Sequence, residues 1–166
     1  MFRVGSGHDT HRLAEGRPLL LGGVRIDHPK GLAGHSDADA VLHAVTDALL
    51  GAAGLGDIGE LFPDTDPAWT DADSRVFLQR AVDDLRRLGW RPVNLDLTVF
   101  AQEPKLGPVK ADLRRSLAEL LGVEAGAVNV KAKTGEHVGP IGRGEAIACE
   151  AVVLVRSAEC GVRNEE

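Results

Sequence analysis

The sequence predicts one compact domain in which helices and strands intermix, an α/β or α+β fold. Three observations lead to this prediction. The chain has 166 residues, the size of a single domain. Its 43% hydrophobic and 27% charged residues are ordinary for a globular protein. Segments of helical period and segments of strand-like alternation follow one another along the chain, with no internal repeat and no linker between them.

The first half predicts two strands and one helix. Residues 2–7 alternate enough for a short strand, and residues 17–26 predict a second strand, interrupted at Gly22 and Gly23 by a bulge or tight bend. Ser36 is predicted to cap a helix, because Asp39 follows at the spacing of a capping box. Apolar residues then recur at helical spacing: Val41, Leu42, Ala44, Val45, Ala48 and Leu49. The glycine-rich and Pro/Asp-rich segments that follow are predicted loops: 51–59 and 62–69.

The second half predicts two further helices and three strands. Residues 74–88 form an amphipathic pattern that ends at Gly89, with these side chains turned inward: Val76, Phe77, Ala81, Leu85 and Leu88. Residues 93–101 alternate cleanly and predict a half-buried strand. The remaining elements are a helix over 108–121 and strands over 127–133 and 144–155, followed by a polar tail over 157–166.

Composition and charge exclude several classes of protein. The net charge of −6 argues against a nucleic-acid partner, which requires a basic surface. The apolar runs are only a few residues long, too short for a membrane helix, and no secretory signal pattern opens the chain. Cys149 and Cys160 match no zinc spacing and are too few for a disulfide framework, so a cytoplasmic protein is expected. An acidic chain that handles phosphates must neutralise them with metal cations or helix N-termini.

A metal site is predicted at Asp9, His11 and His43. In an extended segment, side chains two apart share a face, so Asp9 and His11 can reach one ion. His43 lies on a helix between Asp39 and Asp47, at spacings of four residues, and these carboxylates are candidate partners that would fix its tautomer. Two imidazoles and one carboxylate are the ligand set of an open zinc site, with the fourth position left for substrate.

Two other segments carry candidate phosphate-binding groups. His35 is expected just before the helix N-terminus, where exposed N–H groups favour a phosphate oxygen. The segment 131–136 (KAKTGE) runs from a strand into a loop, where Thr134 can hold phosphate oxygens and Glu136 can hold Mg²⁺. The pair Gly5 and Gly7 lacks the continuation of a dinucleotide fingerprint, and no nucleophile elbow or Walker loop is present.

Taken together, these segments resemble the 2-C-methyl-D-erythritol 2,4-cyclodiphosphate synthases of the non-mevalonate isoprenoid pathway. The matching stretches, in family order, are G-x-D-x-H at 7–11, LLLGGVRI at 19–26, the long block around HSDAD and FPDTDP at 31–67, DSR at 73–75, VNVKA at 128–132 and GRGEAIACEAV at 142–152. The resemblance runs over residues 2–156, and the block at 31–67 is highly specific.

The resemblance implies an α+β catalytic domain over residues 1–156, built from a mixed sheet with helices packed on one face. It implies a homotrimer whose sheets face the threefold axis and whose active sites lie between subunits. It also implies a lyase that closes a cyclic diphosphate on 4-diphosphocytidyl-2-C-methyl-D-erythritol 2-phosphate and releases CMP.

The resemblance assigns roles residue by residue. One zinc ion per subunit binds Asp9, His11 and His43, and a second ion, Mg²⁺ or Mn²⁺, binds Glu136. His35 and Thr134 are the catalytic hydrogen-bond donors, and Arg143 contacts a phosphate. The substrate further contacts Ser36, Asp57, Gly59, Phe62, Asp64, Asp66, Ala101, Lys105 and Lys133.

The chain departs from the family pattern at a few positions, and two other functions compete with cyclisation. Lys133 and Gly135 replace hydroxyl residues of the common K-A-T-T-T-E, and Pro140 replaces an aromatic residue; these changes concern the nucleotide contacts. The first alternative is a zinc hydrolase that uses the same ligands with water as nucleophile. The second is a metal-stabilised trimer that binds a cytidine nucleotide without turnover.

Overall fold

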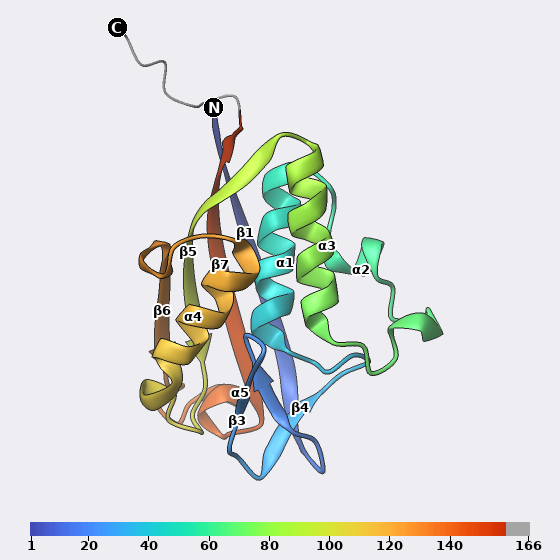
Figure 1. Cartoon of the computed structure of the whole chain (residues 1–166). Helices are drawn as coiled ribbons and strands as arrows, with labels where there is room; N and C mark the ends of the chain where they lie inside the picture. Colours follow the sequence, from blue (N-terminus) through green and yellow to red (C-terminus); the bar gives the residue numbers. More distant parts are fainter. Residues whose placement is uncertain (159–166) are drawn as a thin grey trace, which may run out of the picture.

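A five-stranded mixed sheet forms one layer of the computed structural model, which describes residues 1–158 (Figure 1). The strand order is β4-β1-β7-β5-β6; β5 and β6 are parallel and the other pairs are antiparallel. The strand bounds are β1 Phe2–Glu15, β4 Lys30–Ala33, β5 Trp90–Phe100, β6 Val128–Lys133 and β7 Ala146–Ser157. A separate hairpin consists of β2 Leu19–Leu21 and β3 Val24–Ile26.

The long helices pack on one face of this sheet (Figure 1). They are α1 Ala40–Ala53, α3 Ser74–Arg87 and α4 Lys110–Leu121. Shorter turns of helix complete the described part of the chain: α2 Ile58–Leu61, α5 Gly139–Gly142 and the 3₁₀ turns Pro67–Trp69, Gly107–Val109 and Ala125–Ala127. The predicted α+β domain with a mixed sheet is confirmed.

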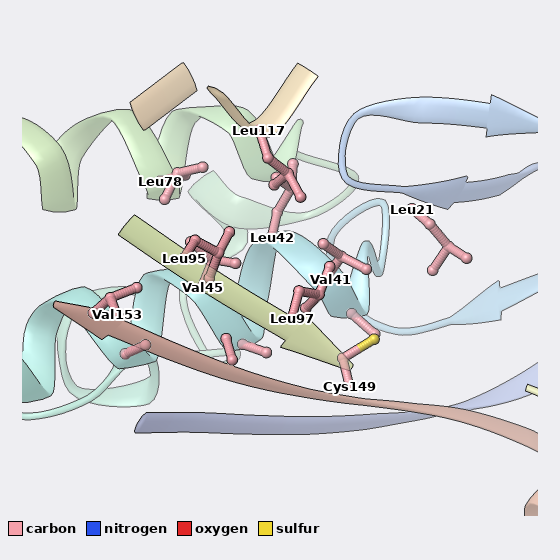
Figure 2. Close-up of a cluster of buried hydrophobic side chains, with 14 of the residues drawn as sticks. Leu21, Val41, Leu42, Val45, Leu78, Leu95, Leu97, Leu117, Cys149 and Val153 are labelled. Carbon is pink, nitrogen blue, oxygen red and sulfur yellow. The ribbon is translucent and has the colours of Figure 1, made fainter. Parts of the chain in front are cut away.

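The hydrophobic core lies between the sheet and these helices (Figure 2). Alternate residues of β5, such as Leu95 and Leu97, and of β7, such as Cys149 and Val153, are fully buried against Leu42 and other helix residues. This follows from the period of two along a strand, which sends every second side chain to the same face. The opposite face of the sheet carries exposed apolar side chains: Phe2, Val4 and Val152.

Helix α1 lies unusually close to strand β1, and two glycines allow this approach. A Cβ atom at Gly5 would stand 1.9 Å from the carbonyl oxygen of Ala48, and one at Gly7 would stand 2.0 Å from that of Ala44. Any larger side chain at these positions would collide with the helix backbone. Gly5 and Gly7, which do not belong to a dinucleotide-binding motif, therefore have a packing role.

The predicted cap of α1 is wrong. The helix begins at Ala40, and its N-cap is Asp39, whose carboxylate accepts a hydrogen bond from the backbone N–H of Leu42 at 3.0 Å. The same carboxylate accepts from the N–H groups of Gly22 and Gly23, at 2.8 and 2.7 Å. Three backbone donors satisfy this fully buried side chain, so the capping-box spacing from Ser36 is coincidental.

Other boundaries differ from the sequence-based expectation. Strand β1 is longer than predicted, and residues 17–26 form two short strands joined by a tight turn at Gly22 and Gly23, both with positive φ. The end of the predicted 51–59 loop enters helix α2. Val76 and Leu88 are exposed, 53% and 51%, rather than inward. Strand β7 continues to Ser157, and most of the predicted tail lies outside the described residues.

Within residues 1–158, no helix combines the length and the apolar character that crossing a bilayer requires.

Candidate metal centre and active site

Asp9, His11 and His43 converge although they come from two elements. Asp9 and His11 point to the helix side of β1, and His43 comes from α1, which Gly7 allows to lie directly above them. The atoms His11 Nε2 and Asp9 Oδ2 are 2.9 Å apart, and His43 Nδ1 lies 3.1 Å from Asp9 Oδ2 and 3.2 Å from His11 Nε2. Among the described residues these three are the only cluster of three potential metal-ligating side chains.

The spacing of these atoms fits an open tetrahedral metal site. Ligands about 2.0–2.1 Å from a tetrahedral ion lie about 3.3 Å from each other. The three distances of 2.9, 3.1 and 3.2 Å are close to that edge length. The donors form one triangular face and leave the fourth corner free. The set of two imidazoles and one carboxylate suits zinc.

The outward nitrogens of both histidines have fixed partners. His11 Nδ1 lies 2.8 Å from the carbonyl oxygen of Ala33, which can only accept, so His11 donates there. In the neutral form of the ring, Nε2 therefore directs its lone pair at the triad. His43 Nε2 lies 2.8 Å from Ser74 Oγ and 3.2 Å from Ser36 Oγ. The carboxylates expected to flank His43 are not its outer partners, because Asp39 caps the helix and Asp47 accepts from the N–H of Ile58.

The charges of the triad are coupled. Burial favours the neutral form of Asp9, but hydrogen bonds to His11 and His43 and their positive charges outweigh burial and lower the pKa of Asp9. Burial also opposes a charge on His11, yet the hydrogen bond to Asp9 and the charge of its carboxylate raise the pKa of His11. The site therefore favours an anionic Asp9 beside a positive charge, either on protonated His11 or on a bound metal ion.

A cavity of about 490 Å³ opens over the triad. Besides the three triad residues, the predicted site residues His35, Ser36, Gly59, Phe62 and Asp64 line this cavity. The predicted position of His35 at the helix N-terminus is wrong, since the helix begins five residues later. His35 is instead held by Asp66 O at 3.3 Å and Thr70 Oγ1 at 3.2 Å.

An aromatic wall of the cavity was not identified in the sequence. The rings of Phe77 and Phe62 pack at a tilt of 33°, with centroids 4.6 Å apart. The ring of Trp69 meets Phe62 edge-on at 5.2 Å and Phe77 edge-on at 5.6 Å. Phe77 also lies 6.0 Å from the ring of His43. Phe77 was predicted only as a core residue of α3, and Gly34 and Trp69 also line the cavity without having been predicted.

A second cavity, of about 320 Å³, lies where β5 and β6 end. Four residues expected to contact the substrate line this cavity: Ala101, Lys105, Lys133 and Thr134. The sheet order separates it from the triad, because β1 and β6 are three strand positions apart. At a strand spacing of about 4.8 Å, the two strands lie about 14 Å apart.

The remaining predicted site residues line neither cavity. Asp57 caps α2 by accepting from the N–H of Glu60, and Asp66 caps the 3₁₀ turn at Pro67–Trp69. Glu136 accepts from Thr134 Oγ1 at 2.5 Å, which places it beside the second cavity. Arg143 is exposed and bonds both carboxylate oxygens of Glu145, at 2.7 and 3.0 Å.

Known proteins resemble this chain over most of its length. The profile of the YgbB family matches residues 2–156. A 2-C-methyl-D-erythritol 2,4-cyclodiphosphate synthase of Bordetella pertussis is 60% identical over 157 residues, which cover 95% of this chain and 97% of that protein. The chain belongs to the cyclodiphosphate synthase family.

Solved structures of the cyclodiphosphate synthase family share the fold. A synthase in its CDP-bound form is 44% identical, with a TM-score of 0.86, and the match covers 93% of this chain and all of that one. The bifunctional IspDF of Campylobacter jejuni is 44% identical, with a TM-score of 0.91 over 95% of this chain. This chain spans only 42% of that bifunctional protein.

Proposed function

We propose that this chain converts 4-diphosphocytidyl-2-C-methyl-D-erythritol 2-phosphate to 2-C-methyl-D-erythritol 2,4-cyclodiphosphate and CMP, as a phosphorus–oxygen lyase. The observation that carries the proposal is the open three-ligand centre of Asp9, His11 and His43 on the wall of a cavity, in a chain 60% identical to a named synthase. We place this reaction in the non-mevalonate isoprenoid pathway. We expect a cytoplasmic enzyme, on the low cysteine content of the sequence.

The two cavities suggest how the substrate is divided. The diphosphate and the methylerythritol belong in the triad cavity, against His35, Ser36 and the α2 turn that begins after Asp57. The cytidine belongs in the second cavity, which Ala101, Lys105, Lys133 and Thr134 line. The remaining residues of the proposed substrate site are Gly59, Phe62, Asp64, Asp66, Ala101, Lys105, Lys133 and Arg143.

Asp9, His11 and His43 would hold zinc, and Glu136 would hold Mg²⁺ or Mn²⁺. When bound, such ions supply Lewis-acid polarisation of phosphate oxygens and neutralise their charge. A chain with a net charge of −6 needs this help to accept a substrate with several negative charges.

The chain's own residues position and stabilise an intramolecular phosphoryl transfer. An oxygen of the 2-phosphate attacks the β-phosphorus, the bond from that phosphorus to the bridging oxygen breaks, and CMP leaves with the bond's electron pair. His35 and Thr134 donate hydrogen bonds to the oxygens of the phosphorus under attack. The nucleophile is already an anion, so no general base is required. The two reacting groups belong to one molecule, and holding both of its ends restricts them to a reactive geometry, which can supply several kcal/mol.

A homotrimer would bring the two cavities together. Strand β4 pairs with β1 only over residues 12–15 of β1. Within the described chain, residues 2–11 of β1 therefore form one edge of the sheet, and this edge includes Asp9. Strand β6 forms the other edge. In a closed ring, the β6 edge of one subunit can face the β1 edge of the next. The exposed Phe2, Val4 and Val152 on the uncovered face support burial of the sheets around a threefold axis.

Product analysis tests the proposed reaction. The metal-loaded protein is incubated with the substrate, and phosphorus NMR and mass spectrometry identify the products. We expect equimolar CMP and a cyclic diphosphate. A linear phosphate ester carrying one added water would indicate the zinc hydrolase. A higher melting temperature with cytidine nucleotides and no CMP release would indicate the binding protein.

A further inference from the structure

Ser74 is a fully buried polar residue with no role in the proposed chemistry. It is the first residue of α3, directly after the N-cap Asp73, and its exposed fraction is 0%. It lies within the DSR motif at residues 73–75, one of the stretches that resemble the synthase family. A buried hydroxyl needs partners, and the partners of Ser74 lead to the metal centre.

Two of these partners are His43 and Asp37. Ser74 Oγ lies 2.8 Å from His43 Nε2, on the side of the ring that faces away from the triad. The same hydroxyl donates a hydrogen bond to Asp37 Oδ1. Asp37 Oδ2 accepts from the backbone N–H of Ser74 at 3.1 Å, so the carboxylate holds Ser74 by two bonds.

The directions of these bonds follow from which groups can donate. The Asp37 carboxylate accepts only, so the Ser74 hydroxyl donates its single proton there. Ser74 Oγ must then accept from His43, which therefore carries its ring proton on Nε2. In the neutral form of the ring, His43 Nδ1 is then left with a lone pair directed at Asp9 and His11, as a metal ligand requires.

We propose that Ser74 and Asp37 form a positioning relay that fixes the tautomer and the ring orientation of the metal ligand His43. The inference rests on the metal role proposed for the triad. His11 is oriented by the main-chain carbonyl of Ala33, whereas His43 is oriented by side chains from α3 and from the loop before α1. Ser36 Oγ, 3.2 Å from His43 Nε2, is the more distant of the two hydroxyls.

Measurement of zinc affinity tests the relay without any use of activity. The apparent Kd of the metal-free protein for zinc is determined by competition with a chromophoric chelator, for wild type and Ser74→Ala. We expect the variant to bind zinc about 10–100-fold more weakly, because loss of a hydrogen-bond partner of a metal ligand typically has an effect of this size. We also expect a changed visible spectrum of the cobalt-substituted protein, because the geometry of the His43 ligand shifts.

Asp37 gives a graded series. Asp37→Asn keeps an oxygen that can accept from the Ser74 hydroxyl, so it should lose less zinc affinity than Asp37→Ala. In the zinc-loaded wild type, a slowly exchanging imidazole N–H proton of His43 should be visible by NMR, and Ser74→Ala should lose it. If Ser74→Ala fails to fold, zinc affinity can still be measured in Asp37→Asn, because this variant leaves the buried Ser74 hydroxyl in place.

Asp73→Ala is the matched control. It removes the N-cap of the same helix, where Asp73 accepts from the N–H of Arg75, but Asp73 does not contact His43 in the structure. It should lower the melting temperature and leave zinc affinity unchanged. Wild-type zinc affinity and an unchanged cobalt spectrum in folded Ser74→Ala and Asp37→Asn would overturn the relay. Failure of the wild type itself to bind zinc would overturn the metal site instead.

Discussion

Gly7 and Ala44 bring strand β1 and helix α1 into backbone contact at the metal centre: a Cβ atom on Gly7 would stand 2.0 Å from the Ala44 carbonyl oxygen. His43 is the residue before Ala44, and Asp9 lies two residues after Gly7, on the same face of the strand. The separation of strand and helix therefore sets the separation of the candidate metal ligands.

Gly7→Ala should disrupt both the fold and the metal site. Relief of the collision requires α1 to move off the sheet, so the loss of stability should exceed the about 1–3 kcal/mol typical of overpacking. Thermal unfolding and zinc titration measure the two effects. Gly126→Ala is the control, because no atom lies within 4 Å of the added Cβ. A Gly7→Ala protein with wild-type stability and zinc affinity would contradict the proposed packing.

The pH dependence of the metal-free protein should reveal the Asp9–His11 pair. Because the pKa of Asp9 is lowered in the folded protein, the pair stabilises the fold at pH values above the ordinary Asp pKa of about 3.9. Because the pKa of His11 is raised, this stabilisation is lost as the pH rises through the pKa of His11 in the folded protein. Asp9→Asn should therefore cost more stability at pH 6 than at pH 9.

Zinc should show the opposite trend, because protons compete for the same nitrogens. The rise in melting temperature on addition of zinc should grow from pH 6 to pH 8. A zinc effect that is independent of pH would argue against histidine ligands.

Glu136→Gln should separate the two metal roles. The variant loses the charge of a carboxylate that lies beside Thr134, far from the triad ligands in the sheet order. We expect full zinc content by metal analysis and a higher Mg²⁺ concentration for half-maximal activity. An unchanged Mg²⁺ titration would remove Glu136 from the metal role, and a loss of zinc would show that the variant disturbs the triad.

Mixing of two inactive variants tests whether active sites lie between subunits. His43→Ala damages the triad, and Thr134→Ala damages the second cavity. If each site takes its triad from one subunit and Thr134 from the next, an equal mixture refolded together should regain about one quarter of wild-type activity, because each boundary joins the two intact halves with a probability of one half times one half. Activity no higher than the sum of the separate variants would place both cavities' functions within one subunit.

The sequence predicted the elements better than the contacts between them. Period two in residues 93–101 and period 3.6 in residues 74–88 located β5 and α3, because burial of one face imposes those periods. The cap of α1 was misplaced, since the capping-box spacing is local whereas Asp39 is held by Gly22 and Gly23 from a distant turn.

The convergence of Asp9, His11 and His43 could be predicted from residue type and resemblance, but the outer partners of the two histidines could not. Asp39 and Asp47 flank His43 in sequence, yet Ser74, 31 residues away, is its partner. The aromatic wall formed by Phe62, Trp69 and Phe77 was missed for the same reason, because it depends on how a loop folds back on α3. Such contacts are decided by tertiary packing, which no local pattern encodes.

X-ray diffraction at the zinc absorption edge, on crystals grown with zinc, would locate the ion directly. We expect one strong anomalous peak per subunit, bonded to Asp9 Oδ2, His11 Nε2 and His43 Nδ1, with the fourth position open to the cavity. An anomalous peak bound by other residues, or none between these three side chains, would rule out the proposed zinc site.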